Sequence, residues 1–316
     1  MPITYRPIAP AIDIPRMAEI WNAHIPGTTS AEALTRNEER FPKEWLLHRT
    51  AAVDEADRLL GWSVAMHPPV AGPGRWQVRV TVDPQQQRQG VGTRLYDEAL
   101  QFAVQHGAIR LDATVPDSLP HGLRFAEARG FRVDRHLFAS VLEMERCDEA
   151  AFAGQGEVEG IRIATLAELG ETPEARHQLW ALEMQLNADV PGYASQGFAV
   201  PYDEYCHMVF EQPWYQADLQ LLALDGHTWV GMASLRPGEK AGRPYLYHNM
   251  TGVVASHRRR QIALALKLAA VRCARRRGAC ELRTDNDSEN VPMLALNQRL
   301  GFEPRPGEYK LVKELR

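Results

Sequence analysis

Two segments of the chain carry apolar residues at the spacing of one helix face, each just after a strand-like or glycine-rich stretch. From Val91 onward the apolar positions fall at i, i+4, i+8 and i+11, and Gly107 ends the pattern. A second helical pattern, at i, i+4, i+7 and i+11, starts at Ile262, and Gly278 ends it. The two predicted faces consist of Val91, Leu95, Ala99 and Phe102, and of Ile262, Leu266, Ala269 and Cys273.

The first half of the chain predicts helices and strands in a mixed order. In chain order these are a helix at 10–23, strands at 59–66 and 76–82, the helix from 91, a strand at 109–115, a helix at 119–129 and final strands within 131–144. The second half repeats this order, with a strand at 281–284 after its long helix. A strand, a glycine-rich turn, a helix and another strand form a βαβ unit, so we expect a mixed α/β (α+β) fold with twisted sheets flanked by helices.

An internal repeat explains this second half. Residues 87–92 read Gln-Arg-Gln-Gly-Val-Gly and a later segment ends in Gly130-Phe131, whereas 258–263 read Arg-Arg-Arg-Gln-Ile-Ala and the matching segment ends in Gly301-Phe302. The offset is 171 in both cases (258 − 87 and 301 − 130). We therefore predict two copies of one domain, at 1–148 and 158–316, with about 15 additional residues around 181–215 in the second copy.

Composition narrows the class of protein. The chain has 316 residues, 45% of them hydrophobic and 24% charged, with a net charge of −4, which is typical of a globular protein without a general attraction to nucleic acid or membranes. We expect no membrane span, and no secretory leader at the start. The four cysteines are scattered, which favours reduced thiols, a cytoplasmic location and no metal site.

One region departs from the near-neutral charge of the whole chain. From residue 250 onward there are 14 Lys and Arg against 7 Asp and Glu. Such an excess is compatible with a solvated helix face, with a small anionic cofactor or with nucleic acid. The cofactor is the interpretation that the next motif favours, and we expect no nucleic-acid partner.

The glycine-rich turn at 87–92 is the motif that carries chemistry. It lies between a predicted strand and a predicted helix, where backbone N–H groups lack partners and the helix dipole favours an anion. Glycine lets the main chain approach a phosphate closely, so the turn suits a pyrophosphate. The pattern is not a Rossmann fingerprint, because only two glycines are present and no early GxGxxG is found.

This turn, closed about 40 residues later by Gly130-Phe131, resembles the GNAT superfamily of acyl-CoA-dependent N-acetyltransferases, whose signature is (Gln/Arg)-x-x-Gly-x-(Gly/Ala) after a strand. The second copy resembles the same family, so the chain is similar to tandem GNAT proteins, of which mycothiol synthase is one type. The resemblance implies acetyl-CoA as co-substrate and a small-molecule amine as acceptor, in a monomer or homodimer. The residues implied to hold CoA are Val82, Gln87, Arg88, Gln89, Gly90, Val91, Gly92 and Thr93 in copy one, and Val253, Arg258, Arg259, Arg260, Gln261, Ile262, Ala263 and Asn290 in copy two.

Copy two departs from the signature, because Gln261 stands where copy one has Gly90. A side chain there is expected to crowd the phosphate or to force a different backbone angle. The neighbouring arginines offer compensating charge. A working CoA site and a decayed site kept as scaffold both remain open.

Both copies lack the tyrosine that often protonates the departing thiolate in the family, since Ala126 and Asn297 occupy that position. At the positions where family bases often lie, copy one has Trp76 and Val78, which cannot accept a proton. Copy two offers Tyr247, with His248 beside it. The candidate catalytic residues are Tyr247, His248 and, on the final strand, Tyr309.

The additional segment of copy two, Asn187–Tyr193 through Trp214 and Tyr215, lies where the family shapes its acceptor pocket. It mixes aromatics with the carboxylates of Asp189, Asp203 and Glu204, which would suit a cationic or aromatic amine, although a plain surface loop fits equally well. We therefore expect acetyl transfer to a primary amine by direct attack in a ternary complex, with the second copy performing the chemistry. The alternative is an acyl-CoA-binding module or sensor without turnover.

Overall fold

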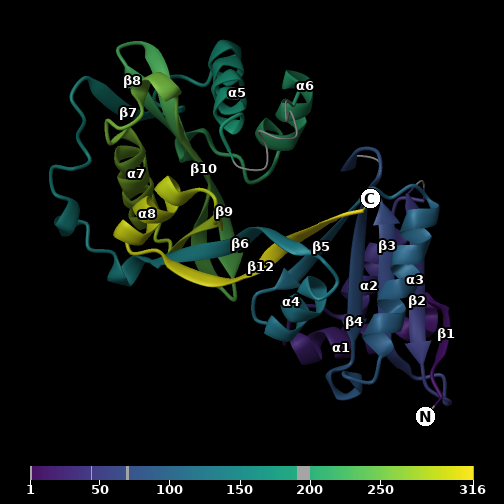
Figure 1. The fold of residues 1–316 in the computed structure, drawn as a ribbon. Coiled ribbons are helices and arrows are strands. Elements are labelled where there is room, and N and C mark those ends of the chain that lie inside the picture. The colour runs from purple at the N-terminus through teal and green to yellow at the C-terminus, as the bar shows by residue number, and fades with distance from the viewer. Residues whose placement is uncertain (1, 44, 69–70, 191–199, 316) are drawn as a thin grey trace. The chain divides into compact units, whose positions relative to one another are not determined.

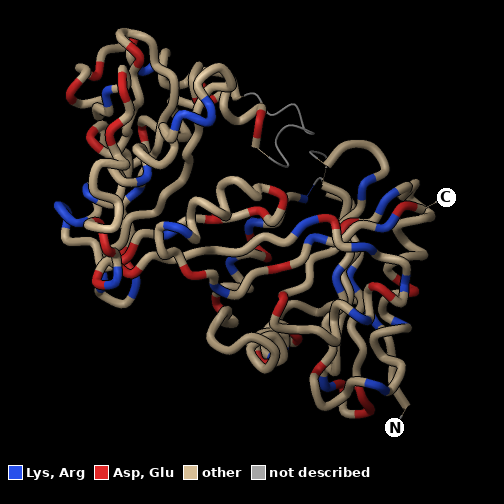
Figure 2. Tube along the Cα trace, turned by 60° about the vertical axis from the view of Figure 1, so that its left-hand side comes forward, with Lys and Arg blue, Asp and Glu red and all other residues tan. Residues whose placement is uncertain are grey.

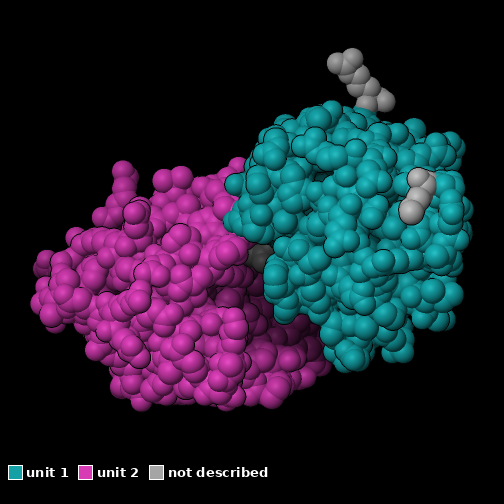
Figure 3. All heavy atoms as spheres, turned by 90° about the horizontal axis from the view of Figure 1, so that it is seen from below, with its two compact units in different colours: residues 1–135, 308–316 teal, residues 136–307 magenta. Residues whose placement is uncertain are grey.

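The computed structural model describes residues 2–43, 45–68, 71–190 and 200–315, and it confirms a mixed α/β fold (Figure 1). The chain divides into two compact units, coloured separately in Figure 3. Unit 1 comprises Met1–Arg135 and Glu308–Arg316, and unit 2 comprises His136–Gly307.

Unit 1 is built on a sheet with helices packed against it. Its strands lie in the order β1, β2, β3, β4, β5 and then the end of β12. The elements are β1 (Thr4–Pro7), α1 (Pro10–His24), α2 (Ala31–Glu39), β2 (Leu46–Val53), β3 (Leu59–His67), β4 (Arg75–Val82), α3 (Val91–Gln105), β5 (Arg110–Pro116) and α4 (Pro120–Glu127).

Unit 2 repeats this arrangement. Its strands lie in the order β6, β11, β10, β9, β8, β7. The elements are β6 (Arg132–Glu143), β7 (Ile161–Thr165), α5 (Pro173–Asn187), α6 (Tyr202–Tyr205), β8 (Gln220–Asp225), β9 (Thr228–Lys240), β10 (Arg243–Val253), α7 (Ile262–Arg276), β11 (Glu281–Asp287), α8 (Val291–Arg299) and β12 (Glu303–Glu314).

The long helices confirm the predicted periodicity. Helices α3 and α7 start and end 171 residues apart (262 − 91 and 276 − 105). Leu95 in α3 and Leu266 in α7 are fully buried. Gly107 and Gly278, which follow the two helices, have φ values of 82° and 64°, the left-handed conformation in which glycine ends helices without strain.

The last strand of each sequence copy completes the sheet of the other unit. Leu137–Glu143 of β6 pair antiparallel with β11 in unit 2. Glu308–Glu314 of β12 pair antiparallel with β5 in unit 1. The compact units therefore differ in extent from the predicted 1–148 and 158–316 by this strand exchange. The buried side chains of these strands follow the same exchange. Leu142 of β6 belongs to the core of unit 2, and Leu311 of β12 belongs to the core of unit 1.

Charged residues of both signs alternate along the chain (Figure 2). In the basic stretch after residue 250, several arginines pair with carboxylates that come from earlier in unit 2. These ion pairs are Arg258–Asp189, Arg260–Asp225, Arg275–Glu149 and Arg277–Asp218. The local excess of positive charge is thus balanced by acidic residues from earlier in the chain. No helix in the described ranges is long and apolar enough to cross a membrane.

Candidate functional site

The signature turn of unit 1 is preformed for an anion. Gly90 caps α3 with a φ of 84°, and Arg88 just before it has a φ of 64°. The first intrahelical bond runs from the amide of Arg94 to the Gly90 carbonyl at 3.1 Å, so the amides of residues 91–93 have no partner within the helix. A cluster of such amides at the start of a 15-residue helix favours a bound phosphate.

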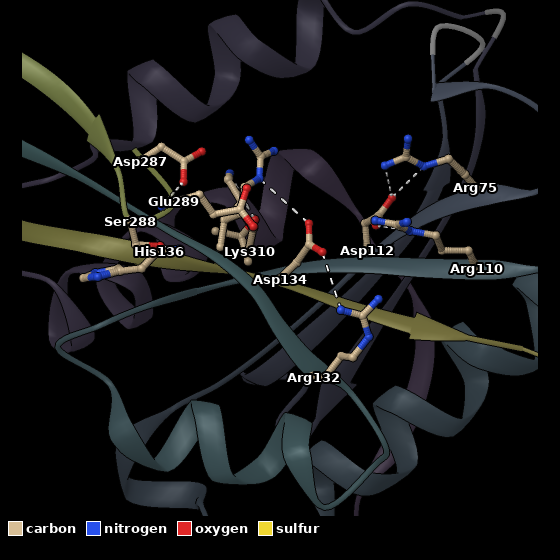
Figure 4. Close-up of polar contacts among 12 residues, drawn as sticks. Arg75, Arg110, Asp112, Arg132, Asp134, His136, Asp287, Ser288, Glu289 and Lys310 are labelled. Carbon is tan, nitrogen blue, oxygen red and sulfur yellow. Dashed lines mark hydrogen bonds and ion pairs between the residues drawn. The ribbon is translucent and has the colours of Figure 1, made fainter. Parts of the chain in front are cut away.

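Strands β4 and β5 diverge beside this turn. They pair in parallel only from Arg75 to Gln77. At this paired end Asp112 accepts hydrogen bonds from Arg75, at 3.0 Å, and from Arg110, at 2.8 Å (Figure 4). The rest of the two strands is free of mutual pairing, which leaves space between them.

A cavity of about 560 Å³ occupies that space, within unit 1. Residues of β4, β5, α3, α4 and the end of α1 line it together with the turn, and most of the lining is apolar. This volume falls within the range of small-molecule and cofactor sites. The lining includes the predicted residues Val82, Gln87, Arg88, Gly90, Gly92 and Thr93. The side chain of Val91 is buried in the core and that of Gln89 is exposed, so these two residues can contribute only their main-chain amides.

Two histidines at the cavity were not found from the sequence. His24, the last residue of α1, has its Nε2 2.8 Å from the carbonyl oxygen of Val82. His121, near the start of α4, has its Nε2 3.4 Å from Nε2 of Gln87. The two rings lie 6.0 Å apart between centroids. Burial, reinforced by His24, Arg124 and Arg88, lowers the pKa of His121 below its usual value. His24 and His121 lie 97 residues apart in the sequence (121 − 24) and belong to no recognisable motif.

The turn of unit 2 has the same backbone conformation despite its different sequence. Gln261 caps α7 with a φ of 64°, and Arg259 has a φ of 62°. The expectation that a side chain here would force a different backbone angle was wrong, because glutamine adopts the left-handed angle itself. That conformation costs a non-glycine residue roughly 1–2 kcal/mol. The arrangement of the amides is thus kept.

The other predicted cofactor residues of unit 2 have partners or are buried. Arg258 donates to the Val253 carbonyl at 3.1 Å and to Asp189. Arg260 is 3.4 Å from Asp225. Ile262 is buried and Ala263 half-buried in the first turn of α7, and Asn290 caps α8. An incoming anion would have to compete with these carboxylates for the two arginines.

The three candidate catalytic residues have different local surroundings. The hydroxyl of Tyr247 donates to Asp285 at 2.6 Å at the surface of unit 2. His248, one residue on, is only 1% exposed and bonds Thr251 at 2.5 Å. Burial, together with the positive charge of Lys267, lowers the pKa of His248 well below its usual value. Tyr309 pairs with Val115 in unit 1 and packs against the core of that unit.

At the position of the missing tyrosine the two units differ. Ala126 lines the cavity of unit 1. In unit 2 Asn297 is buried and donates to Asn286 at 2.7 Å, which in turn donates to Ser140 at 2.8 Å. At the two mapped base positions of unit 1, Trp76 and Val78 are buried in the core, as apolar residues should be.

Unit 2 also contains polar and aromatic contacts that the sequence did not predict. The Tyr205 hydroxyl donates to Glu183 at 2.5 Å, and burial raises the pKa of that carboxyl. Arg236 on β9 lies over the rings of Trp214, at 5.0 Å, and Tyr247, at 4.9 Å.

The predicted carboxylates of the additional segment either pair with an arginine or are exposed. Asp189 is engaged by Arg258, and Asp203 and Glu204 are exposed in α6. Residues 191–199 of that segment lie outside the described residues. Among the residues that the structure describes, no group of three or more His, Cys, Asp or Glu is arranged to hold a metal ion.

Comparison with known proteins identifies the family. A model of the Acetyltransferase (GNAT) family matches residues 14–131 and 188–302. The chain therefore belongs to the GNAT family and is a tandem GNAT acetyltransferase, an acyltransferase that depends on acetyl-CoA.

Individual relatives share this architecture. The chain is 26% identical over 239 residues to the mycothiol acetyltransferase of Saccharomonospora viridis, covering 73% of this chain and 72% of that protein. Among solved structures, a GCN5-related N-acetyltransferase from Sphaerobacter thermophilus superposes with a TM-score of 0.68 at 20% identity, over 99% of this chain and 96% of the other. A tandem GNAT protein from the clavulanic acid biosynthesis pathway has a TM-score of 0.60 at 21% identity, over 99% and 98%.

Proposed function

We propose that this protein transfers the acetyl group of acetyl-CoA to a primary amine of a small molecule by direct attack in a ternary complex. The observation that supports acetyl-CoA as the donor is the cavity between β4 and β5 of unit 1, which is lined by Gly90 and Gly92 of the signature turn. A pyrophosphate fits the free amides of that turn, and a pantetheine arm fits the apolar space between the strands.

In the proposed reaction the amine nitrogen attacks the thioester carbonyl carbon and the carbon–sulfur bond breaks. The acetyl group becomes an amide, the amine loses one proton, and the departing thiolate of CoA gains one. Main-chain amides of the strand before the turn would stabilise the oxyanion that forms in between.

Unit 2 supplies the groups for the proton transfer in this proposal. Its turn keeps the left-handed backbone at Arg259 and Gln261, which supports acetyl-CoA there as well as in unit 1. The 2.6 Å hydrogen bond from Tyr247 to Asp285 forms a short relay. The phenol oxygen can accept a proton from the amine while its own proton passes to the carboxylate.

His248 is not part of this relay, because its burial keeps it neutral and its Nε2 already bonds Thr251. Unit 1 has no proton acceptor at the two mapped base positions, Trp76 and Val78, and would bind acetyl-CoA without turnover. Tyr309, which lies in unit 1, is no longer a candidate base in this scheme.

The test is release of CoA thiol from acetyl-CoA with a panel of primary amines, with the acetylated product identified by mass spectrometry. We expect turnover with at least one amine, and a loss of about 10²–10⁴-fold in kcat for Asp285→Asn. The exposed Asp203→Asn is the matched control and should match the wild type. Stabilisation by CoA without turnover of any amine would instead establish the binding module.

A further inference from the structure

His24 and His121 come from two different helices and converge on the cavity of unit 1. His24 ends α1 and His121 lies in the first turn of α4. Both belong to the lining of the cavity, together with Gln87 and Arg88 of the turn. The two imidazoles thus lie beside the amides that are free to bind a phosphate.

The hydrogen bonds of the two rings define their protonation. A carbonyl oxygen only accepts, so Nε2 of His24 carries a proton and donates to Val82, at 2.8 Å. The 3.4 Å contact of His121 Nε2 is with the amide nitrogen of Gln87, which only donates. The His121 nitrogen therefore accepts, and this ring is neutral.

Burial and the groups around His121 together lower its pKa and favour the neutral ring. It faces His24 from α1, Arg88 from the turn and Arg124 from α4, and all three oppose a further positive charge. Partial burial acts in the same direction. An anion that enters beside this ring favours its protonated form, because a nearby negative charge stabilises the imidazolium.

We propose that His121 binds the phosphates of CoA in unit 1, and that it takes up a proton when they bind. A protonated imidazole offers an N–H on each ring nitrogen, so His121 would donate a charge-assisted hydrogen bond to a phosphate oxygen. The inference rests on the proposed CoA site of unit 1 and adds to it a dependence on pH. Binding should be tighter in mildly acidic than in mildly alkaline solution.

The experiment is calorimetric titration of the full-length protein with dephospho-CoA at pH 7, in two buffers that differ in ionisation enthalpy. Dephospho-CoA keeps the pyrophosphate but lacks the terminal monophosphate, whose own titration near pH 6 would obscure the result. The difference in observed enthalpy between the buffers gives the number of protons taken up. Pantetheine, which has no phosphate, is the ligand control.

We expect uptake of a measurable fraction of a proton with dephospho-CoA and none with pantetheine. The dissociation constant should rise between pH 6 and pH 8, by at most about tenfold per pH unit. His121→Gln should abolish both effects. His106→Gln removes an exposed histidine of unit 1 that lies outside the cavity and should preserve both.

Two results would overturn the inference and can be told apart. If dephospho-CoA binds without proton uptake, or if uptake survives in His121→Gln, the role given to His121 is wrong while the cofactor site stands. If neither CoA nor dephospho-CoA binds, the proposed function fails, and the inference fails with it.

Discussion

Residues at the two signature turns hold the same left-handed backbone with different side chains. Gly90 has a φ of 84° and Gln261 has a φ of 64°. The sequence predicted a phosphate-binding turn from the glycine. It misjudged the glutamine, because a single unfavourable angle is tolerated when the strand and helix on either side determine it.

This difference predicts opposite effects of two substitutions on stability. Gly90→Ala should lower the free energy of unfolding by about 1 kcal/mol, because no atom crowds the new Cβ and only the backbone angle opposes it. Gln261→Gly should raise that free energy by at most about 1 kcal/mol, because glycine adopts the angle freely. Urea denaturation measures both. Equal destabilisation by the two substitutions would contradict the account.

A second prediction at this scale concerns Lys267, which is 1% exposed and lies 5.1 Å from the ring centroid of Phe302. Burial lowers its pKa from 10.5 to about 7. Between those values the unfolded chain holds a proton that the folded chain has lost. The cost of burying the charged amine therefore applies in full below pH 7 and decreases as the pH rises. The free energy of unfolding increases with pH in this range, by roughly 1.4 kcal/mol per pH unit at most.

Lys267→Met should remove that slope and stabilise the protein near pH 7. Denaturation between pH 7 and pH 10 measures it, with the exposed Lys240→Met as control, which should keep the wild-type slope. Identical slopes for wild type and Lys267→Met would show that the buried amine keeps its proton.

At the scale of elements, sequence patterns predicted the helices better than the partners of the strands. The apolar spacing from Val91 and from Ile262 is confirmed by α3 and α7, because a helix face is specified by residues close in sequence. The pairing of β6 and β12 depends on long-range contacts. The alternating apolar and polar positions of β6 and β12 would fit the sheet of either unit. The exchange of these two strands could therefore not be predicted from the sequence. His24 and His121 escaped prediction for the same reason.

Because of this strand exchange, a residue from the second sequence copy packs in the core of unit 1. Leu311 of β12 is 1% exposed in the core of unit 1. Leu311→Ala should cost about 2–5 kcal/mol. Hydrogen exchange followed by mass spectrometry should show faster exchange in Arg110–Pro116, the partner strand in unit 1. Faster hydrogen exchange confined to β11 would contradict the assignment of β12 to the sheet of unit 1. Leu142→Ala is the reciprocal variant and should act on β11.

At the scale of the molecule, charge and architecture point to a small anionic ligand. The arginines of the basic stretch are balanced by carboxylates such as Asp189 and Glu149. We therefore expect no saturable binding of duplex DNA at about 150 mM salt, where exposed charges are largely screened. Fluorescence polarisation of a labelled duplex tests this expectation. Saturable binding at that ionic strength would revive the nucleic-acid interpretation.

The most direct test of the central claim is a crystal structure of the protein with acetyl-CoA bound. The account predicts the pyrophosphate on the amides of residues 88–93, with the pantetheine arm between β4 and β5 of unit 1. An empty unit 1 cavity at saturating acetyl-CoA, with the cofactor bound elsewhere or nowhere, would contradict it.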